Sequence, residues 1–364
     1  MTSPSIPEKA SQGAIFSTPI DFLLIGGLSI AHYFVLLVFG SSFNPETVMW
    51  FAALSVPLTW VINNPHFSAT SWRLYRSKSD MQQFPVTAFV LPVFMTLLTA
   101  IALLAPQEFG PWYIKFYLLW SPYHFSAQTL GVALLYARRS NFQISPGLRK
   151  LLTFFIFSTF LGPSLRAEQS LTGATYYGIT TPSFHLPDWV WPTFQYSMWG
   201  LGVLLLAALI ISARTQLRKT PPLFVVLLPL IQYVWFVAGS GVNGFTEYVP
   251  AYHSLQYLTI AWLMELRTRQ CERKIAPSRF YVGSTTTLWA AANVVGGLAL
   301  FAGLPWLAAR ATGLDPFMTT GIVIAGVQMH HFFVDGVIWK LKNPAIGSPL
   351  LATLGTLTGR TAHA

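Results

Sequence analysis

The chain has 364 residues, of which 53% are hydrophobic, 15% aromatic and only 9% charged. Soluble domains carry about a quarter charged residues, so this composition excludes an ordinary soluble protein and predicts an integral membrane protein. The formal net charge of +10 is spread over turns between apolar segments. That distribution favours contact with anionic membrane lipids over binding of nucleic acid.

Apolar windows recur along the whole chain, and most are long enough to cross a membrane as helices at 1.5 Å per residue. They predict an all-α, polytopic transmembrane helical bundle of about ten spans. The window after residue 150 is the weakest, because Pro163 follows it closely enough to allow a half-span. The windows are 19–39, 47–72, 85–105, 113–137, 150–163, 196–213, 222–240, 248–266, 285–308 and 317–340.

Positive charge alternates between successive connections, as expected when Lys and Arg collect on the cytoplasmic side. The loops at 73–78, 138–150, 214–219 and 267–279 are basic, as is the end of the last window with Lys340 and Lys342. The alternation predicts both termini in the cytoplasm of a multi-pass protein, which we expect in the bacterial inner membrane. The opposite connections carry Glu46, Glu108, Glu168, Asp188, Glu247 and Asp315.

The predicted domain organisation is simple. We expect a polar N-terminal tail at 1–18 without the features of a cleaved signal peptide, one transmembrane bundle at 19–342 and a C-terminal tail at 343–364. The connection at 164–195 is unusually long and rich in aromatic residues, which favour the level of the lipid headgroups. It predicts an external segment that either covers the bundle or acts as a lid over a substrate entrance.

Histidine occurs near the middle of four apolar windows, as His66, His124, His253 and the doublet His330-His331. An ionisable side chain at membrane depth costs roughly 2 to 3 kcal/mol, so it persists where it pairs, lines a cavity or binds a metal. The charged loops place the four windows in the same direction and the histidines at similar depth. They therefore predict one shared centre rather than four separate features.

Other residues around the histidines support a metal site. Pro65, Pro122 and Pro250 lie one to three residues before a histidine, and proline kinks open cavities in membrane helices. Several neutral imidazoles can bind iron, zinc or copper. Asp335 lies four residues after His331 on the same helical face, as a ligand or as an acceptor that fixes a histidine tautomer. Further hydrogen-bonding candidates are Asn64, Gln128, Glu247 and Gln256.

Taken in order, the histidine motifs resemble the membrane-bound β-carotene dioxygenases of the Brp/Blh family. The matching segments are Pro65-His66, His124-Phe125-Ser126-Ala127-Gln128, His253-Ser254-Leu255-Gln256-Tyr257, and His330 with Asp335. Tyr257 stands where the family has a second histidine, and His331 is additional. Outside about 50 residues in these four pieces, the similarity is generic hydrophobicity.

The resemblance implies oxidative cleavage of a lipophilic polyene by non-haem Fe(II), with O2 as co-substrate. It implies His66, His124, His253 and His330 as ligands and His331 as a substitute. Asp335 would support the site, and Tyr257 would hydrogen-bond to the oxygen substrate. Alternatives are a multi-span haem b electron-transfer protein, a proton-coupled transporter and a purely structural membrane subunit. The expected partners are a lipophilic small molecule and membrane lipids, with no nucleic acid, and the sequence leaves protein partners open.

Overall fold

The computed structural model describes residues 13–242, 244–341 and 343–359, and these form helices apart from one short hairpin. The helices of the first half are α1 (Thr18–Phe22), α2 (Leu28–Phe39), α3 (Pro45–Leu58), α4 (Asn64–Tyr75), α5 (Lys78–Gln83), α6 (Leu91–Leu104), α7 (Gly110–Arg139), α8 (Pro146–Thr159) and α9 (Leu161–Ala167). An antiparallel hairpin follows, in which β1 (Thr175–Tyr176) pairs with β2 (Ile179–Thr180). The second half contains α10 (Val190–Thr215), α11 (Leu223–Tyr233), α12 (Val249–Glu272), α13 (Arg279–Leu298), α14 (Leu304–Thr312), α15 (Pro316–Ile338), α16 (Pro344–Gly347) and α17 (Leu354–Thr358).

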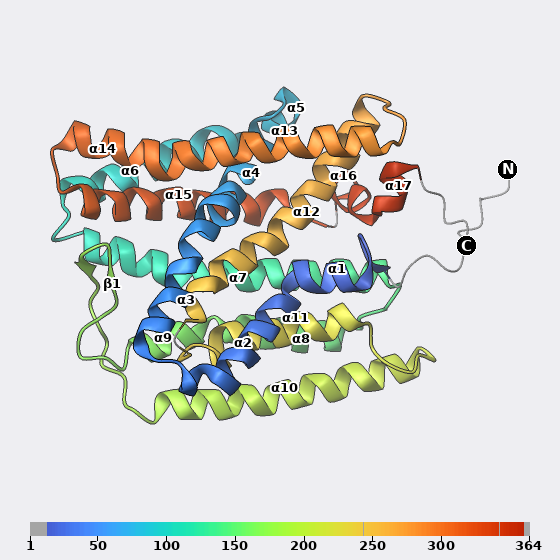
Figure 1. Ribbon diagram of the computed structural model, residues 1–364, viewed down its shortest axis with the longest axis horizontal. Helices are drawn as coiled ribbons and strands as arrows, with labels where there is room; N and C mark the ends of the chain where they lie inside the picture. Colours follow the sequence, from blue (N-terminus) through green and yellow to red (C-terminus); the bar gives the residue numbers. More distant parts are fainter. Residues whose placement is uncertain (1–12, 243, 342, 360–364) are drawn as a thin grey trace.

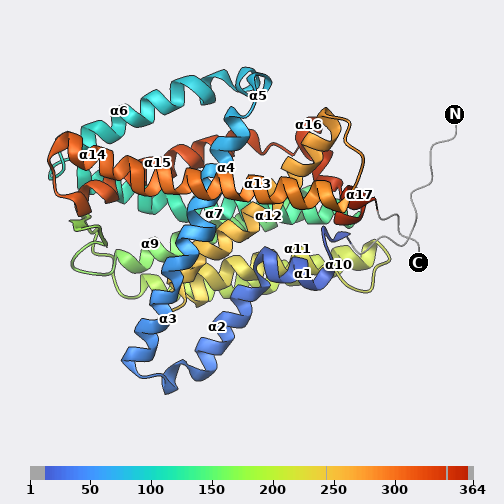
Figure 2. The same ribbon diagram turned by 45° about the horizontal axis from the view of Figure 1, so that its top comes forward.

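Most helices lie along the long axis of the molecule, while α4 and α12 cross it obliquely (Figure 1). The oblique pair is enclosed, because α13 packs on α4, α15 packs on both α4 and α7, and α12 also packs on α4. In Figure 2, α2 and α3 project below the rest as a hairpin. The enclosed region between α4, α7, α12 and α15 is where polar side chains can be removed from lipid.

π-helical turns bend several of these helices. The turn at Leu23–Gly27 joins α1 to α2, and the turn at Thr59–Asn63 joins α3 to α4. Gly26 in the first turn has φ 125°, which residues with a Cβ rarely adopt, and a Cβ there would lie 2.7 Å from Ile231 Cδ1. Such turns are often found at functional sites. Here the second turn sets the direction in which α4 enters the bundle.

The fold is the predicted all-α helical bundle, and six of its helical segments are long and apolar enough to cross a membrane. Large apolar side chains are exposed along them, including Leu37, Met49 and Trp50. Exposed apolar surface of this extent suits lipid rather than water. The six segments are Thr18–Phe39, Pro45–Tyr75, Val86–Leu104, Val190–Thr215, Arg279–Thr312 and Pro316–Ile338.

The other predicted windows are also helical, but they are shorter or more polar than these six segments. The apolar helix Leu223–Ala238 is shorter than the six segments, and α8 has only 14 residues. Helices α7 and α12 have 30 and 24 residues, which is ample length. Both carry buried polar side chains such as Thr129 and Glu265, which lower their hydropathy.

The described parts of both predicted tails pack against the bundle. Ile15 is fully buried, and so are Leu350 and Leu357. Arg139, at the end of α7, donates hydrogen bonds to the carbonyls of residues 13, 14, 350 and 352. A few apolar side chains and one guanidinium therefore hold both segments in place. Residues 1–12, Lys342 and residues 360–364 lie outside the described part of the chain.

The aromatic segment at 164–195, which is predicted to be external, packs against the bundle. It contains most of α9, the hairpin and the start of α10. Lys115 of α7 forms an ion pair with Glu168 at 2.5 Å and donates to the carbonyl of Pro182 at 2.6 Å. The Lys115 ammonium also lies 4.2 Å from the centre of the Phe184 ring. These contacts fix the segment to the N-terminal half of α7.

Candidate metal centre

Helices α4, α7, α12 and α15 bring the predicted histidines together. Between α4 and α15, His66 contacts His331, and Thr70 then meets Asp335 one turn further along both helices. Between α4 and α12, His66 contacts Ser254, and Thr70 then meets Tyr257. Because these contacts advance together along each pair, α4, α12 and α15 run in the same direction. Their histidines therefore share one level in the bundle, as the sequence predicts.

Local chain geometry positions His66. Pro65 lies in the first turn of α4, directly after the π-helical turn Thr59–Asn63. On the opposite side α13 approaches closely, because a Cβ on Gly297 would lie 2.9 Å from the carbonyl carbon of Asn64. Only a residue without a side chain permits this approach. The result is that His66 is completely buried.

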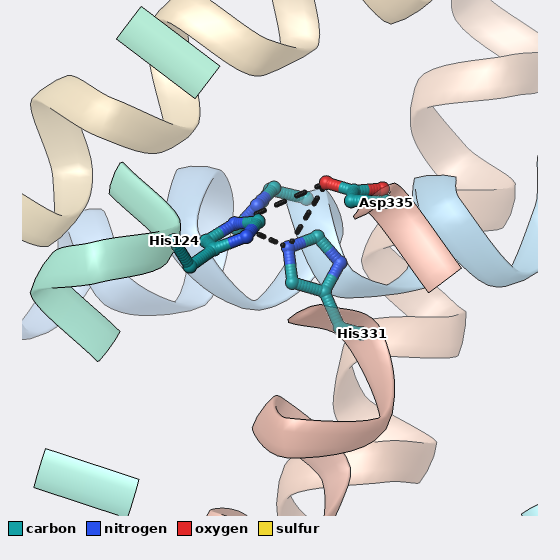
Figure 3. Close-up of side chains that lie close together, drawn as sticks. His124, His331 and Asp335 are labelled. Carbon is teal, nitrogen blue, oxygen red and sulfur yellow. Dashed lines mark hydrogen bonds and ion pairs between the residues drawn. The ribbon is translucent and has the colours of Figure 1, made fainter. Parts of the chain in front are cut away.

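Four buried side chains converge on one point: His66, His124, His331 and Asp335. Each offers one ligand atom, and these atoms all lie within 4.8 Å of one another. His124 Nε2 lies 3.1 Å from His331 Nε2, and Asp335 Oδ2 lies 3.3 Å from His331 Nε2 and 3.9 Å from His124 Nε2. Figure 3 shows His124 reaching from α7 toward the two side chains of α15.

These separations fit a first-row transition metal. Ligand atoms bound at 2.0–2.2 Å from one ion lie about 2.9–3.4 Å apart when they occupy adjacent positions. The His331 distances already fall in this range, and the wider ones need only small side-chain movements. Three imidazoles and one carboxylate also form a donor set that binds iron or zinc. The residues present therefore fit a metal ion.

The tautomer of His66 gives independent support for a metal. Ser254 Oγ donates to Asn63 Oδ1 at 2.8 Å, so it is free to accept from His66 Nδ1–H at 3.0 Å. This leaves His66 Nε2 with a lone pair, and Nε2 is buried without a hydrogen-bond partner among the described residues. A histidine that donates through one nitrogen and presents the other is the usual arrangement of a metal ligand.

Asp335 is oriented in a comparable way. Its Oδ1 accepts hydrogen bonds from Thr70 Oγ1 at 2.9 Å, from the Tyr257 hydroxyl at 3.2 Å and from Trp339 Nε1 at 3.2 Å. Its Oδ2 faces the histidines instead. One oxygen is thus held by three donors, and the other is available to a metal.

Removing the Ser254 hydroxyl tests the tautomer argument. We expect Ser254→Ala to weaken metal binding by about 10- to 100-fold, the usual effect of losing a hydrogen-bond partner of a ligating histidine. The measurement is metal affinity by competition with a chelator. Ser197→Ala in α10 is the control, because its hydroxyl bonds only to its own helix. Equal affinity of both variants would contradict this role of Ser254.

His253 lies beside the four groups but is not one of them. Its ring centre is 5.2 Å from those of both His66 and His124, and it stacks on Phe125 with ring centres 3.7 Å apart. Both ring nitrogens are buried and without partners among the described residues. The side chain thus adjoins the centre, and its predicted role as a ligand stays a prediction.

The structure separates the two residues of the His330-His331 doublet. His331 belongs to the four-residue cluster, while His330, about 100° further round the helix, does not. Tyr257 contacts Asp335 and Thr70, so its hydroxyl lies beside the Asp335 carboxylate. Thr70, Ser254 and Trp339 were not predicted as partners of the centre. Thr70 and Trp339 carried a signal, since they lie one helical turn after His66 and Asp335 respectively.

The predicted hydrogen-bonding residues have different surroundings. Gln128 donates to the His253 carbonyl and to Gln256, and Gln256 donates to the carbonyl of Ile25. The Asn64 side-chain oxygen is buried without a hydrogen-bond partner among the described residues. Glu247 lies outside the centre, in a short turn before α12, within hydrogen-bonding distance of Thr246. Gln128 and Gln256 therefore tie α7 and α12 together next to the histidines.

A cavity of about 330 Å³ adjoins the cluster. His124, Tyr257 and Asp335 line one part of it, and most of the remaining wall consists of apolar side chains of α7 and α15, such as Trp120 and Phe332. The volume lies within the range of small-molecule pockets. The candidate metal centre therefore faces a space that can hold an apolar molecule.

Comparison with known proteins gives no match to a family model, to a curated protein or to a solved structure. The resemblance to the Brp/Blh family therefore depends on the four histidine motifs alone.

Proposed function

We propose that this chain is an integral membrane oxygenase that uses non-haem Fe(II) and O2 to oxidise a lipophilic substrate. The observation that carries the proposal is the convergence of three imidazoles and one carboxylate inside an apolar helical bundle, next to an apolar cavity. Histidine and carboxylate ligands that leave positions open suit oxygen chemistry at iron. Cleavage of a carotenoid-like polyene is the reaction that the Brp/Blh motifs imply.

The side chains of the site have different roles in this proposal. His66, His124 and His331 would hold the metal, and Asp335 would offset part of its charge in a region without water. Iron in such a site supplies binding and activation of O2. Trp120 and Phe332 form apolar wall next to His124 and exclude water from the reacting groups.

Tyr257 is the hydroxyl group best placed to take part in proton transfer. It lines the cavity and donates a hydrogen bond to Asp335 Oδ1. A substrate in the cavity would therefore meet a phenolic O–H next to the carboxylate that holds the metal. The hydroxyl can hold a proton at this edge of the site while Thr70 and Trp339 keep the tyrosine and the carboxylate in place.

The arrangement of the rings argues against the haem alternative. Ring centres lie 4.3 Å apart for His66 and His331 and 4.8 Å apart for His124 and His331. Axial haem ligation needs two imidazoles on opposite faces of a flat porphyrin. In this cluster a third imidazole and a carboxylate have ligand atoms within 4.8 Å of those of the same pair. A small ion fits this geometry better.

The proposed topology has ten spans and places both termini in the cytoplasm. It is supported by Arg139, which joins the first and last described segments at the C-terminal end of α7. Loops that end near this side are rich in Lys and Arg, as expected for cytoplasmic connections.

The test uses the full chain, purified in detergent. The proposal predicts about one bound iron per chain, no Soret band, and O2 consumption that depends on both iron and an added polyene such as β-carotene, with oxidised products. Protein stripped by a chelator is the control. Stoichiometric zinc, or a haem spectrum, would contradict the iron oxygenase.

A further inference from the structure

The cavity beside the metal centre is long and directional. Along α7 its wall runs from Trp120 through His124 to Leu135, about 22 Å of helix at 1.5 Å per residue. Along α15 it runs from Phe332 past Asp335 to Lys340, just beyond the end of the helix. Tyr117 of α7 bonds to Gln328 of α15, and His124 lies 3.9 Å from Asp335, so α7 and α15 run in the same direction. The space therefore extends from the candidate metal centre toward the C-terminal ends of both helices.

Two glycines line this space, one on each helix. A Cβ added to Gly131 of α7 or to Gly336 of α15 would have no other atom within 4 Å. Each glycine therefore borders open space. Few of the lining side chains are charged or strongly polar, so the elongated cavity matches a single apolar chain lying parallel to the two helices.

Charge distinguishes the two ends of the cavity. Asp335 is the acidic residue of the lining and lies at the inner end, beside the histidines. Lys340 is the basic residue of the lining and lies at the outer end, exposed and without an ion pair among the described residues. Arg138 adds a second cation nearby, since a Cβ on Gly347 would lie 2.8 Å from Arg138 Nη1 and 2.6 Å from the carbonyl oxygen of Leu341, which also lines the cavity.

We propose that the cavity binds a single-chain amphiphile with an anionic headgroup, specifically a long-chain carboxylate. Its carboxylate lies near Lys340 and its hydrocarbon chain runs inward to His124 and Asp335. The proposed binding site is inferred from the cavity and from the charged residues that line it. That the chain is oxidised there depends on the proposed function. Access is from the side of the bundle where α7 and α15 end, and none of the residues that line the cavity comes from the segment at 164–195.

The position of the metal along the cavity determines which carbons it reaches. His124 and Leu135 are eleven residues apart on α7, about 16 Å along the helix axis. A carboxylate held at the outer end therefore places the middle or distal part of a long chain beside the metal. Short-chain acids cannot span this distance.

The experiment measures binding of spin-labelled stearate to the full chain in nanodiscs of neutral phosphatidylcholine. Electron paramagnetic resonance resolves a protein-immobilised component from lipid-dissolved probe. We expect Gly131→Leu and Gly336→Leu each to reduce this component by more than about fivefold while retaining metal. Gly283→Leu in α13 is the matched control, because its Cβ also meets no atom within 4 Å and it lies outside the cavity wall.

The headgroup is tested with Lys340→Gln, an exposed change that disturbs no packing. It should weaken stearate binding about three- to fivefold, as for one exposed ion pair, and leave the methyl ester unaffected. Equal binding of acid and ester to the unaltered chain, or no effect of the two leucine variants, would overturn the proposal. The proposal would also be overturned if a polyene without a headgroup bound more strongly than stearate and displaced the probe.

Paramagnetic Mn²⁺ loaded in place of the native metal separates this proposal from the proposed function. A nitroxide near the end of the chain should be broadened by bound Mn²⁺, and one near the carboxylate much less. Immobilised probe without any metal binding would leave the carboxylate site standing and remove the metal centre. Metal binding without immobilised probe would leave the metal centre standing and contradict the carboxylate site.

Discussion

Replacing His331 with alanine is expected to lower metal affinity by more than about 100-fold, whereas His330→Ala leaves it within about twofold. The two substitutions remove the same side chain from neighbouring positions of α15. Only His331 belongs to the cluster, with its Nε2 at 3.1 Å from His124 Nε2 and 3.3 Å from Asp335 Oδ2. Loss of a ligand exceeds the 10- to 100-fold effect of losing an outer hydrogen-bond partner.

The measurement is metal content and affinity of both variants after purification under the same conditions. Each variant should also elute as a single species in size-exclusion chromatography, which shows that the bundle is folded. Metal loss in the His330 variant with full retention in the His331 variant would reverse the assignment and return the ligand to the residue that the family motif favoured.

The second large effect is expected for Asp335→Asn. This change keeps the size of the side chain but removes its charge, and the amide cannot replace a carboxylate as a ligand of Fe(II). We expect metal affinity to fall by more than about 100-fold and oxidation of the substrate to be lost. A metal titration of the purified variant checks the first expectation, and O2 consumption checks the second.

Tyr257→Phe is the informative companion to this variant. The tyrosine donates to Asp335 Oδ1, which still accepts from Thr70 and Trp339 when the phenol is removed. Metal affinity should therefore fall by no more than about tenfold, while turnover falls further if the hydroxyl takes part in proton transfer. Full activity of the Asp335→Asn variant would show that the carboxylate is not a ligand.

The sequence predicted which residues form the candidate site better than it predicted how they are arranged in space. The cost of ionisable groups in lipid singled out His66, His124, His253 and the His330-His331 doublet, and three of these histidines, His66, His124 and His331, belong to the cluster. The charged loops gave the common helix direction that the contacts display. The all-α bundle was also predictable, because apolar windows of the required length form helices. The packing of the described parts of the tails could not be predicted, since it depends on Arg139 and a few apolar side chains from distant segments.

The choice between His330 and His331 shows why motif comparison and helix geometry can disagree. The motif favoured His330, which precedes the aspartate by five residues. Helix geometry favours His331, because residues four apart share a face. The partner Ser254 could not be predicted, for a different reason. Its contact joins α12 to α4, and the position of α4 depends on the Thr59–Asn63 turn and on the close approach at Gly297.

X-ray absorption at the iron edge of the purified full chain tests the central claim most directly, that His66, His124, His331 and Asp335 hold iron. The account predicts about one iron per chain with nitrogen and oxygen neighbours, multiple scattering from about three imidazoles and no porphyrin signal. It also predicts a smaller imidazole contribution from any iron that remains in the His331→Ala variant. An iron-free protein, or imidazole scattering unchanged in that variant, would contradict it.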